Sequence, residues 1–188
     1  MNTVNKNTLV SIALALIVIA IIWVMTPPFV KPVITLTLSK SNVPITDIFQ
    51  SRDVGEVRTH KLDKINLHQS NRFSHPKLGP LGWSENFFAD IDMTFTLEKA
   101  GRYRFVVGSD DGFSLKVNNK ELCRFVRDRP YRKQTCPVTL DAGEHHLLLS
   151  YFQGYGLAGL TLEFAPADGG KRVYWGERLP GLSYTTAQ

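Results

Sequence analysis

The sequence predicts an all-β fold, an antiparallel β-sandwich or barrel, preceded by one N-terminal transmembrane helix. Three observations support this fold class. A single uninterrupted apolar segment lies near the N-terminus, apolar and polar residues alternate with a period of two through most of the rest, and no long amphipathic helix pattern follows the apolar segment. With 43% hydrophobic and 21% charged residues, the 188-residue chain has the composition of a globular protein and the length of one domain.

The apolar segment, Leu9 to Met25, contains no charged residue. As a helix it would be about 26 Å long, near the minimum for crossing a bilayer, and Trp23 stands where interface aromatics are enriched. We therefore predict a short cytoplasmic N-terminus (residues 1–8), a transmembrane signal anchor (9–26), a proline-containing linker (27–31) and an extracytoplasmic domain (32–188). A cleaved signal peptide is the alternative, although no A-x-A-like cleavage site follows. The charges of Lys6 and Lys31 weakly favour this orientation, which for a bacterium means a single-pass inner-membrane protein with its C-terminal domain in the periplasm.

Five apolar runs predict the central strands, at residues 91–97, 103–107, 113–117, 145–152 and 160–164. The run 145–152 is the most continuously apolar, which is typical of a strand in the middle of a sheet. Lys-Ala-Gly, Asp-Asp-Gly, Asp-Ala-Gly and Gly-Tyr-Gly turn signals separate the runs, and further strands are expected near Val33, near Val57 and at the C-terminus.

Cys123 and Cys136 are the two cysteines, and an even number in an exported domain predicts a disulfide bond. Two buried free thiols are the alternative. Metal binding is disfavoured because no CxxC occurs and because the neighbours His145 and His146 would point to opposite faces of a strand. The basic residues between the cysteines predict a disulfide-closed loop that is either merely solvated or able to bind phosphate, uronate or lipid headgroups; they are Arg124, Arg127, Arg129, Arg132 and Lys133.

The sequence GSDDGFSLKV raises the question of why two carboxylates stand side by side. Asp111 and Gly112 between two alternating runs predict a hairpin turn. Asp110 adds repulsion that a turn does not need, so we expect a cation or positive loop nearby, and calcium is the ion that prefers such oxygens. No G-x-S-x-G, H-E-x-x-H or phosphate-cradling glycine loop occurs, so we expect no enzyme.

The succession AGRYRFVVGSDDGFSLKVNNKEL and VTLDAGEHHLLLSYFQGYGLAGLTLEF resembles the PA14 domain, a β-sandwich module of bacterial toxins, glycosidases and fungal adhesins, over about Trp83 to Phe164. The resemblance implies carbohydrate binding. In the adhesin branch two consecutive aspartates joined by a cis peptide hold calcium, and they correspond to Asp110 and Asp111. A second loop normally adds an asparagine or aspartate, but its counterpart here, QGYGLAG, has neither, so Gln153 or backbone carbonyls would substitute.

Aromatic side chains near these loops are candidate stacking surfaces for sugars, with core packing as the alternative. Tyr155, between two glycines, is the first candidate, and Phe152, Trp83 and Tyr131 are others; Phe152 ends an apolar run, which favours the core.

These observations together predict a membrane-tethered module that recognises an envelope or exported glycan or polysaccharide, with calcium as the expected cofactor. The alternative is a non-catalytic interaction or scaffold subunit that binds another envelope protein, as part of an envelope, secretion or polysaccharide-export complex. Nucleic acid is not an expected partner, because an exported domain rarely meets it.

Overall fold

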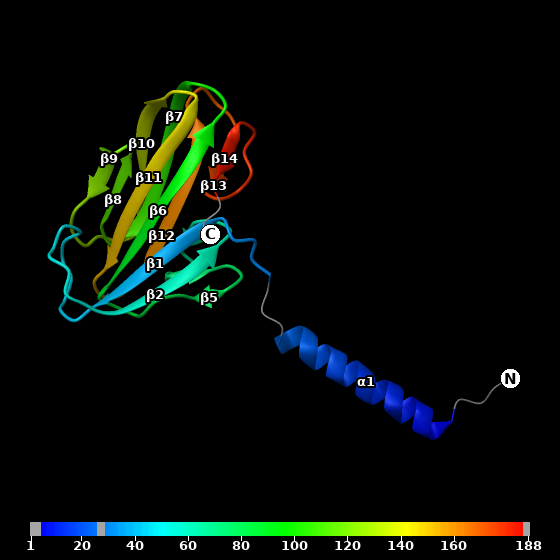
Figure 1. Cartoon of the computed structure of the whole chain (residues 1–188). Coiled ribbons are helices and arrows are strands. Elements are labelled where there is room, and N and C mark those ends of the chain that lie inside the picture. Colours follow the sequence, from blue (N-terminus) through cyan, green and yellow to red (C-terminus); the bar gives the residue numbers. More distant parts are fainter. Residues whose placement is uncertain (1–4, 26–28, 186–188) are drawn as a thin grey trace.

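The structure is a computed structural model that describes residues 5–25 and 29–185. Figure 1 shows an isolated N-terminal helix followed by two packed layers of β-strands. The predicted all-β sandwich with one preceding apolar helix is confirmed.

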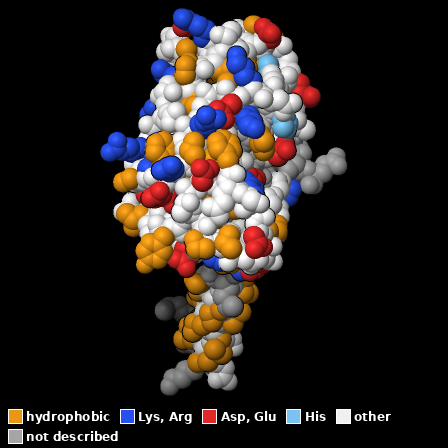
Figure 2. All heavy atoms as spheres, turned by 90° about the vertical axis from the view of Figure 1, so that its left-hand side faces the viewer, with side chains coloured by type: hydrophobic (Ala, Val, Ile, Leu, Met, Phe, Trp, Pro, Cys, Tyr) orange, Lys and Arg blue, Asp and Glu red, His pale blue; other side chains and the backbone are white. Residues whose placement is uncertain are grey.

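The helix α1 (Lys6–Met25) carries the apolar segment. It is the one helix in the described part of the chain that is long and apolar enough to cross a membrane, and none of its span Asn7–Val24 is buried. Hydrophobic side chains cover the part of its surface visible in Figure 2. A core helix would bury one side, so this helix suits a membrane anchor or a signal sequence.

The first sheet has the strand order β2-β1-β6-β11-β8-β9, and β14 also pairs with β6. Its strands are β1 (Ile34–Ser41), β2 (Val54–Leu62), β6 (Phe87–Leu97), β8 (Phe113–Val117), β9 (Lys120–Phe125), β11 (Gly143–Gln153) and β14 (Leu182–Tyr184). The second sheet has the order β10-β7-β12-β13, and β3 pairs with β12. Its strands are β3 (Asn66–Leu67), β7 (Gly101–Asp110), β10 (Arg132–Leu140), β12 (Gly159–Pro166) and β13 (Val173–Tyr174). A separate small ribbon is formed by β4 (Ser74–His75) and β5 (Gly79–Pro80).

The alternating side chains meet between the two sheets. Strand β11 pairs with β6 along its whole length and with β8 on its other side, which confirms the prediction of a central strand. On the second sheet, Phe105 and Phe164 face the core and pack against Trp175. Their burial supplies the hydrophobic stabilisation that holds the sheets together.

The predicted Asp-Gly hairpin is wrong. Strand β7, which ends at Asp110, lies in the second sheet, whereas β8, which begins at Phe113, lies in the first. The two residues between them, Asp111 and Gly112, carry the chain from one sheet to the other. A Cβ on Gly112 would meet the Phe152 ring at 2.6 Å and the backbone carbonyl of Phe125 at 2.7 Å, so glycine is required here by close packing.

The predicted basic loop is also corrected. Half of the segment between the cysteines is strand: Arg124 lies on β9, and Arg132 and Lys133 lie on β10. The tight hairpin in this region is formed instead by strands β8 and β9, and Asn118 and Asn119, both with positive φ, make its turn.

The predicted disulfide bond between Cys123 and Cys136 is present, with 5.8 Å between the Cα atoms. Cys123 lies on β9, at one end of the first sheet, and Cys136 lies on β10, at one end of the second. The bond therefore fastens the two sheets together along one side of the sandwich.

Candidate functional site

The candidate site is an open cavity of about 710 Å³ around the paired aspartates. Strand β7 delivers Asp110 to it, and three loops surround the pair: residues 44–46 after β1, 128–130 after β9, and 154–157 after β11. Because each loop leaves the sandwich at the same end, residues far apart in sequence meet there.

The two aspartates are held by backbone groups of these loops. Asp111 Oδ1 accepts a hydrogen bond from the Arg129 N–H (3.2 Å), and Oδ2 accepts one from the Gly154 N–H (2.8 Å). The Asp110–Asp111 peptide bond is cis, as the resemblance implied. Asp111 thus joins the 128–130 and 154–157 loops, while both carboxylates line the same cavity.

The pair is electrostatically costly to ionise. Burial raises the pKa of Asp111 to about 6 against the opposing hydrogen bonds, and the charges of Asp110 and Asp128 add to the rise. Burial likewise raises the pKa of Asp110, although the Tyr131 N–H and the Arg129 charge oppose it. A bound cation, or hydroxyl groups that donate hydrogen bonds, would favour the ionised pair.

Gln153 does not take the place that the sequence suggested for it. Its side chain is completely buried. Its Oε1 lies 2.6 Å from the Tyr151 hydroxyl, which also contacts the Asp110 carbonyl, and its Nε2 donates to the Leu157 carbonyl (2.9 Å). The buried Gln153 side chain therefore stabilises the 154–157 loop through the Leu157 carbonyl, and its side-chain oxygen is not available to a ligand.

Tyr155 stands at the rim of the cavity with 85% of its surface exposed, beside Leu157 with 59% exposed. Its position between Gly154 and Gly156 keeps the ring out of the core. Phe152, by contrast, is fully buried in a small cluster with Phe88.

The other two aromatic candidates lie outside the lining of this cavity. Trp83 is partly buried under the Arg58 guanidinium, 4.4 Å from the ring centroid. Tyr131 stacks on His68 with 3.7 Å between the ring centroids, and its hydroxyl lies 2.7 Å from the Thr161 hydroxyl.

The five basic residues do not form one binding surface. Lys133 makes an ion pair with the buried Glu163 (2.5 Å), and Arg124 lies over the Phe49 ring. In Figure 2, which faces β8 and β9, basic side chains are interspersed with acidic and hydrophobic ones. Arg129 alone of the five lines the cavity.

Arg129 is held from several directions. Its guanidinium lies over the rings of Phe125 (4.3 Å) and Phe113 (5.4 Å), and Nη2 donates to the Ser109 hydroxyl (2.8 Å). Burial lowers its pKa, while its charge partly compensates that of Asp110.

The oxygen atoms that the aspartate pair offers match part of a calcium coordination shell. Asp110 and Asp111 offer carboxylate oxygens, but no group of three or more histidine, cysteine, aspartate or glutamate side chains within residues 5–25 and 29–185 is placed to hold one metal ion. Calcium takes six to eight oxygens. Backbone carbonyls and ligand hydroxyls would have to supply the rest.

Sequence reasoning missed two contributors to the cavity. Asp128 adds a third carboxylate to its lining, and residues 44–46 form one wall. The wall is positioned by Asn86, whose Oδ1 accepts a hydrogen bond from the Ile45 N–H (3.1 Å). No spacing pattern marks these residues, because they come from separate loops.

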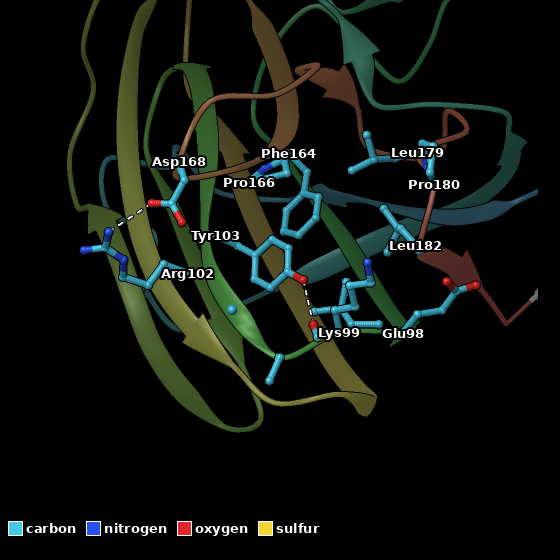
Figure 3. A pocket seen from close by; sticks show the side chains of 14 residues that line it. Glu98, Lys99, Arg102, Tyr103, Phe164, Pro166, Asp168, Leu179, Pro180 and Leu182 are labelled. Atoms are coloured by element: carbon cyan, nitrogen blue, oxygen red, sulfur yellow. Dashed lines mark hydrogen bonds and ion pairs between the residues drawn. The ribbon is translucent and has the colours of Figure 1, made fainter.

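A second cavity, of about 360 Å³, lies at the other end of the sandwich (Figure 3). The Tyr103 ring points into it, stacked on Phe164, and the Tyr103 hydroxyl donates to the Lys99 carbonyl. The two cavities lie at opposite ends of strand β7, which is about 30 Å long. Their linings share no residue.

Comparison with solved structures identifies the fold. A PA14 sugar-binding domain from an RTX adhesin matches 77% of this chain and 94% of its own, with a TM-score of 0.60 and 17% identity. The domain has the PA14 fold. The PA14 domain of the MpAFP antifreeze protein also matches, over 79% of this chain and 89% of its own (TM-score 0.58, 13% identity). No protein-family model matches the sequence, and neither does any curated protein.

A third PA14-like neighbour is the A domain of epithelial adhesin 9 from Candida glabrata, in complex with Galβ1-3GlcNAc. It matches 84% of this chain and 90% of its own, with a TM-score of 0.58 and 12% identity. At these identities the likeness shows the fold, and the resemblance predicted from the sequence is confirmed at that level.

Proposed function

We propose that the protein is a membrane-tethered, non-enzymatic PA14 domain that binds a glycan in the Asp110–Asp111 cavity. The observation that carries the proposal is the pair of buried carboxylates opening into a 710 Å³ cavity with Tyr155 exposed at its rim. Carboxylates accept hydrogen bonds from sugar hydroxyls, and an exposed aromatic ring offers a surface on which a sugar can stack.

The neighbours support the same function. One is described as a sugar-binding domain and another is in complex with a galactose-containing disaccharide. Their shared fold with this chain makes glycan binding the first function to test, and the proposal assigns it to the cavity at the paired aspartates.

We further propose that Asp110 and Asp111 hold calcium when the glycan binds. Calcium would neutralise the pair and would bring sugar hydroxyls into its coordination shell. Asp111 would contribute through lone pairs that its two backbone hydrogen bonds leave free.

The proposed location is the bacterial inner membrane, with α1 as the anchor and the sandwich in the periplasm. The disulfide bond supports an oxidising compartment, and the wholly exposed apolar surface of α1 supports a membrane.

A glycan array probed with the purified full chain in detergent tests the function. We expect binding to a defined set of glycans that weakens at least tenfold in Asp110→Asn and when EDTA is added. Asp168→Asn is the matched control, because that carboxylate is exposed and borders the cavity at the other end of the sandwich.

If no glycan binds with or without calcium, the proposal is wrong, and the interaction-subunit alternative becomes the better one. Capture of a specific envelope protein by the full chain, lost on substitution of the exposed Arg127 and Arg132 but not of Asp110, would support that alternative.

A further inference from the structure

The 154–158 loop separates the Asp110–Asp111 cavity from a neighbouring one. Gly154, Tyr155 and Leu157 line the aspartate side, whereas Gly156 and Ala158 line a cavity of about 440 Å³ on the other side. We call the latter the Trp83 cavity. Tyr155 has the most exposed large side chain of this shared loop, and we call the loop the Tyr155 crest. Because one loop lines both cavities, neighbouring units of one extended ligand can occupy both.

The Trp83 cavity is built from the segment between β3 and β6. It is lined by Asn71, Arg72, Phe73, Pro80, Leu81, Gly82, Trp83 and Ser84 beside the two loop residues. The Asn71 carbonyl accepts a hydrogen bond from the Ala158 N–H (3.1 Å), which ties this segment to the loop. The Trp83 indole is set in place by Arg58 and by the Phe87 ring.

The two cavities differ in charge. Asp110, Asp111 and Asp128 face a single arginine, Arg129, in the first. Among the residues that the structure describes, Arg72 is the one charged residue that lines the Trp83 cavity. Its backbone is fixed by two hydrogen bonds with Gln69, its side chain is exposed, and its guanidinium makes no ion pair with the rest of the described chain.

These features bear on the class of glycan. In the first cavity the three carboxylates offer hydrogen-bond acceptors, and a calcium ion on the aspartate pair would take sugar hydroxyls as ligands, so this cavity suits a hydroxyl-rich unit. An arginine with free donors beside an indole suits a sugar unit that carries a carboxylate or a sulfate, because the guanidinium can donate two parallel hydrogen bonds to either group.

We infer that the ligand is an acidic oligosaccharide that crosses the Tyr155 crest, with a hydroxyl-rich unit at Asp110 and Asp111 and an anionic unit in the Trp83 cavity against Arg72. This inference rests on the proposed glycan-binding function and specifies its ligand class. The preference for an anionic over an uncharged ligand is assigned to Arg72, and not to the basic residues between the cysteines.

Matched pairs of polysaccharides test the inference. The full chain in detergent is titrated against polygalacturonate and its carboxyl-reduced, uncharged form, and against dextran sulfate and dextran. We expect the charged member of at least one pair to bind roughly tenfold more tightly at low salt, with the difference shrinking in 0.5 M NaCl because screening weakens exposed charge pairs. The preferred pair also shows whether the anion is a carboxylate or a sulfate.

Substitutions locate the effect. Arg72→Gln should remove the preference by weakening binding of the charged form, whereas Arg178→Gln, at an exposed arginine on the C-terminal segment, should keep it. Equal binding of both members of each pair by the unsubstituted chain, or a preference that survives Arg72→Gln, would overturn the inference while leaving the proposed function standing. Absence of binding to every probe, or binding indifferent to Asp110→Asn, would count against the proposed function itself.

Discussion

Asp111 joins two loops at the cost of burying a carboxyl group. Its pKa in the folded protein, about 6, lies above its ordinary value of 3.8. Between these two pH values the folded state holds one more proton than the unfolded state, so stability falls as pH rises. Above pH 6 the cost is fully present and amounts to about 3 kcal/mol in the absence of calcium.

We therefore predict that, in EDTA, the free energy of unfolding depends differently on pH in the Asp111→Asn variant. The unsubstituted protein should lose stability from Asp111 between about pH 4 and pH 6, and the variant should lack this contribution. Urea denaturation at several pH values measures the difference. Parallel pH profiles of the two proteins would contradict it.

Gly112 is required by packing, because the Phe152 ring and the carbonyls of Phe125 and Arg127 leave no room for a Cβ. We predict that Gly112→Ala destabilises the domain by about 2 kcal/mol, because the backbone neighbours cannot move aside. In Gly55→Ala the three atoms nearest to the added Cβ all belong to the flexible end of the Asn42 side chain. This control should change the urea midpoint little; equal losses in the two variants would refute the packing explanation.

At the residue scale the sequence was informative about Asp110 and Asp111 and misleading about Gln153. Adjacent acidic residues are visible as a pattern, and the resemblance gave them a role. Gln153 is the last residue of a strand predicted from a continuously apolar run, and nothing in that pattern shows that the Tyr151 hydroxyl and the Leu157 carbonyl occupy its amide. Asp128 and Arg72 join their cavities only through the tertiary fold, so sequence spacing could not reveal them.

Among the elements, β9 and β10 depend most on their disulfide bond. Each lies at the end of its sheet, so each has a strand partner on one side only. Cys123 and Cys136 are 13 positions apart, and the chain-entropy relation gives about 3 kcal/mol for closing a loop of this size.

We predict that replacing both cysteines by serine lowers the free energy of unfolding by about 3 kcal/mol. Reduction of the unsubstituted protein by dithiothreitol should have a comparable effect, and the variant should not respond to the reductant. Urea denaturation with and without reductant measures both. A variant as stable as the oxidised protein would contradict the prediction.

Strand positions were predictable because alternation with a period of two marks a surface buried on one face. The central position of β11 followed from its continuous apolar run. Sheet membership was not predictable: β7 and β8 have the same pattern and adjoin an Asp-Gly signal, yet they belong to different sheets. Local turn chemistry permits both a hairpin and a crossing, and the choice is made by long-range packing.

The whole molecule should respond to calcium if the aspartate pair is a metal site. A ligand that binds only the folded state stabilises it by about 2.7 kcal/mol at one hundred times its dissociation constant. For a domain of this size we predict a rise in melting temperature of roughly 5–10 °C with millimolar calcium.

The control ion is magnesium, which prefers a smaller and more regular shell. Asp110→Asn and Asp111→Asn should each abolish the calcium effect, and differential scanning fluorimetry of the full chain measures it. An unchanged melting temperature in calcium would remove the ion from the proposed function and leave the glycan site to be tested without it.

The path of the chain through β1 has a mechanical consequence. The strand begins at Ile34, on the side of α1, and ends at Ser41, just before the 44–46 wall of the aspartate cavity. It pairs with β2 along its length and with β6 near its end. A glycan pulled away from an anchored α1 would therefore load β1 along its axis, in shear. Antiparallel hydrogen bonds run across the strands and share such a load, so the domain should resist tension better in this direction than across the sheet, a difference that single-molecule pulling can measure.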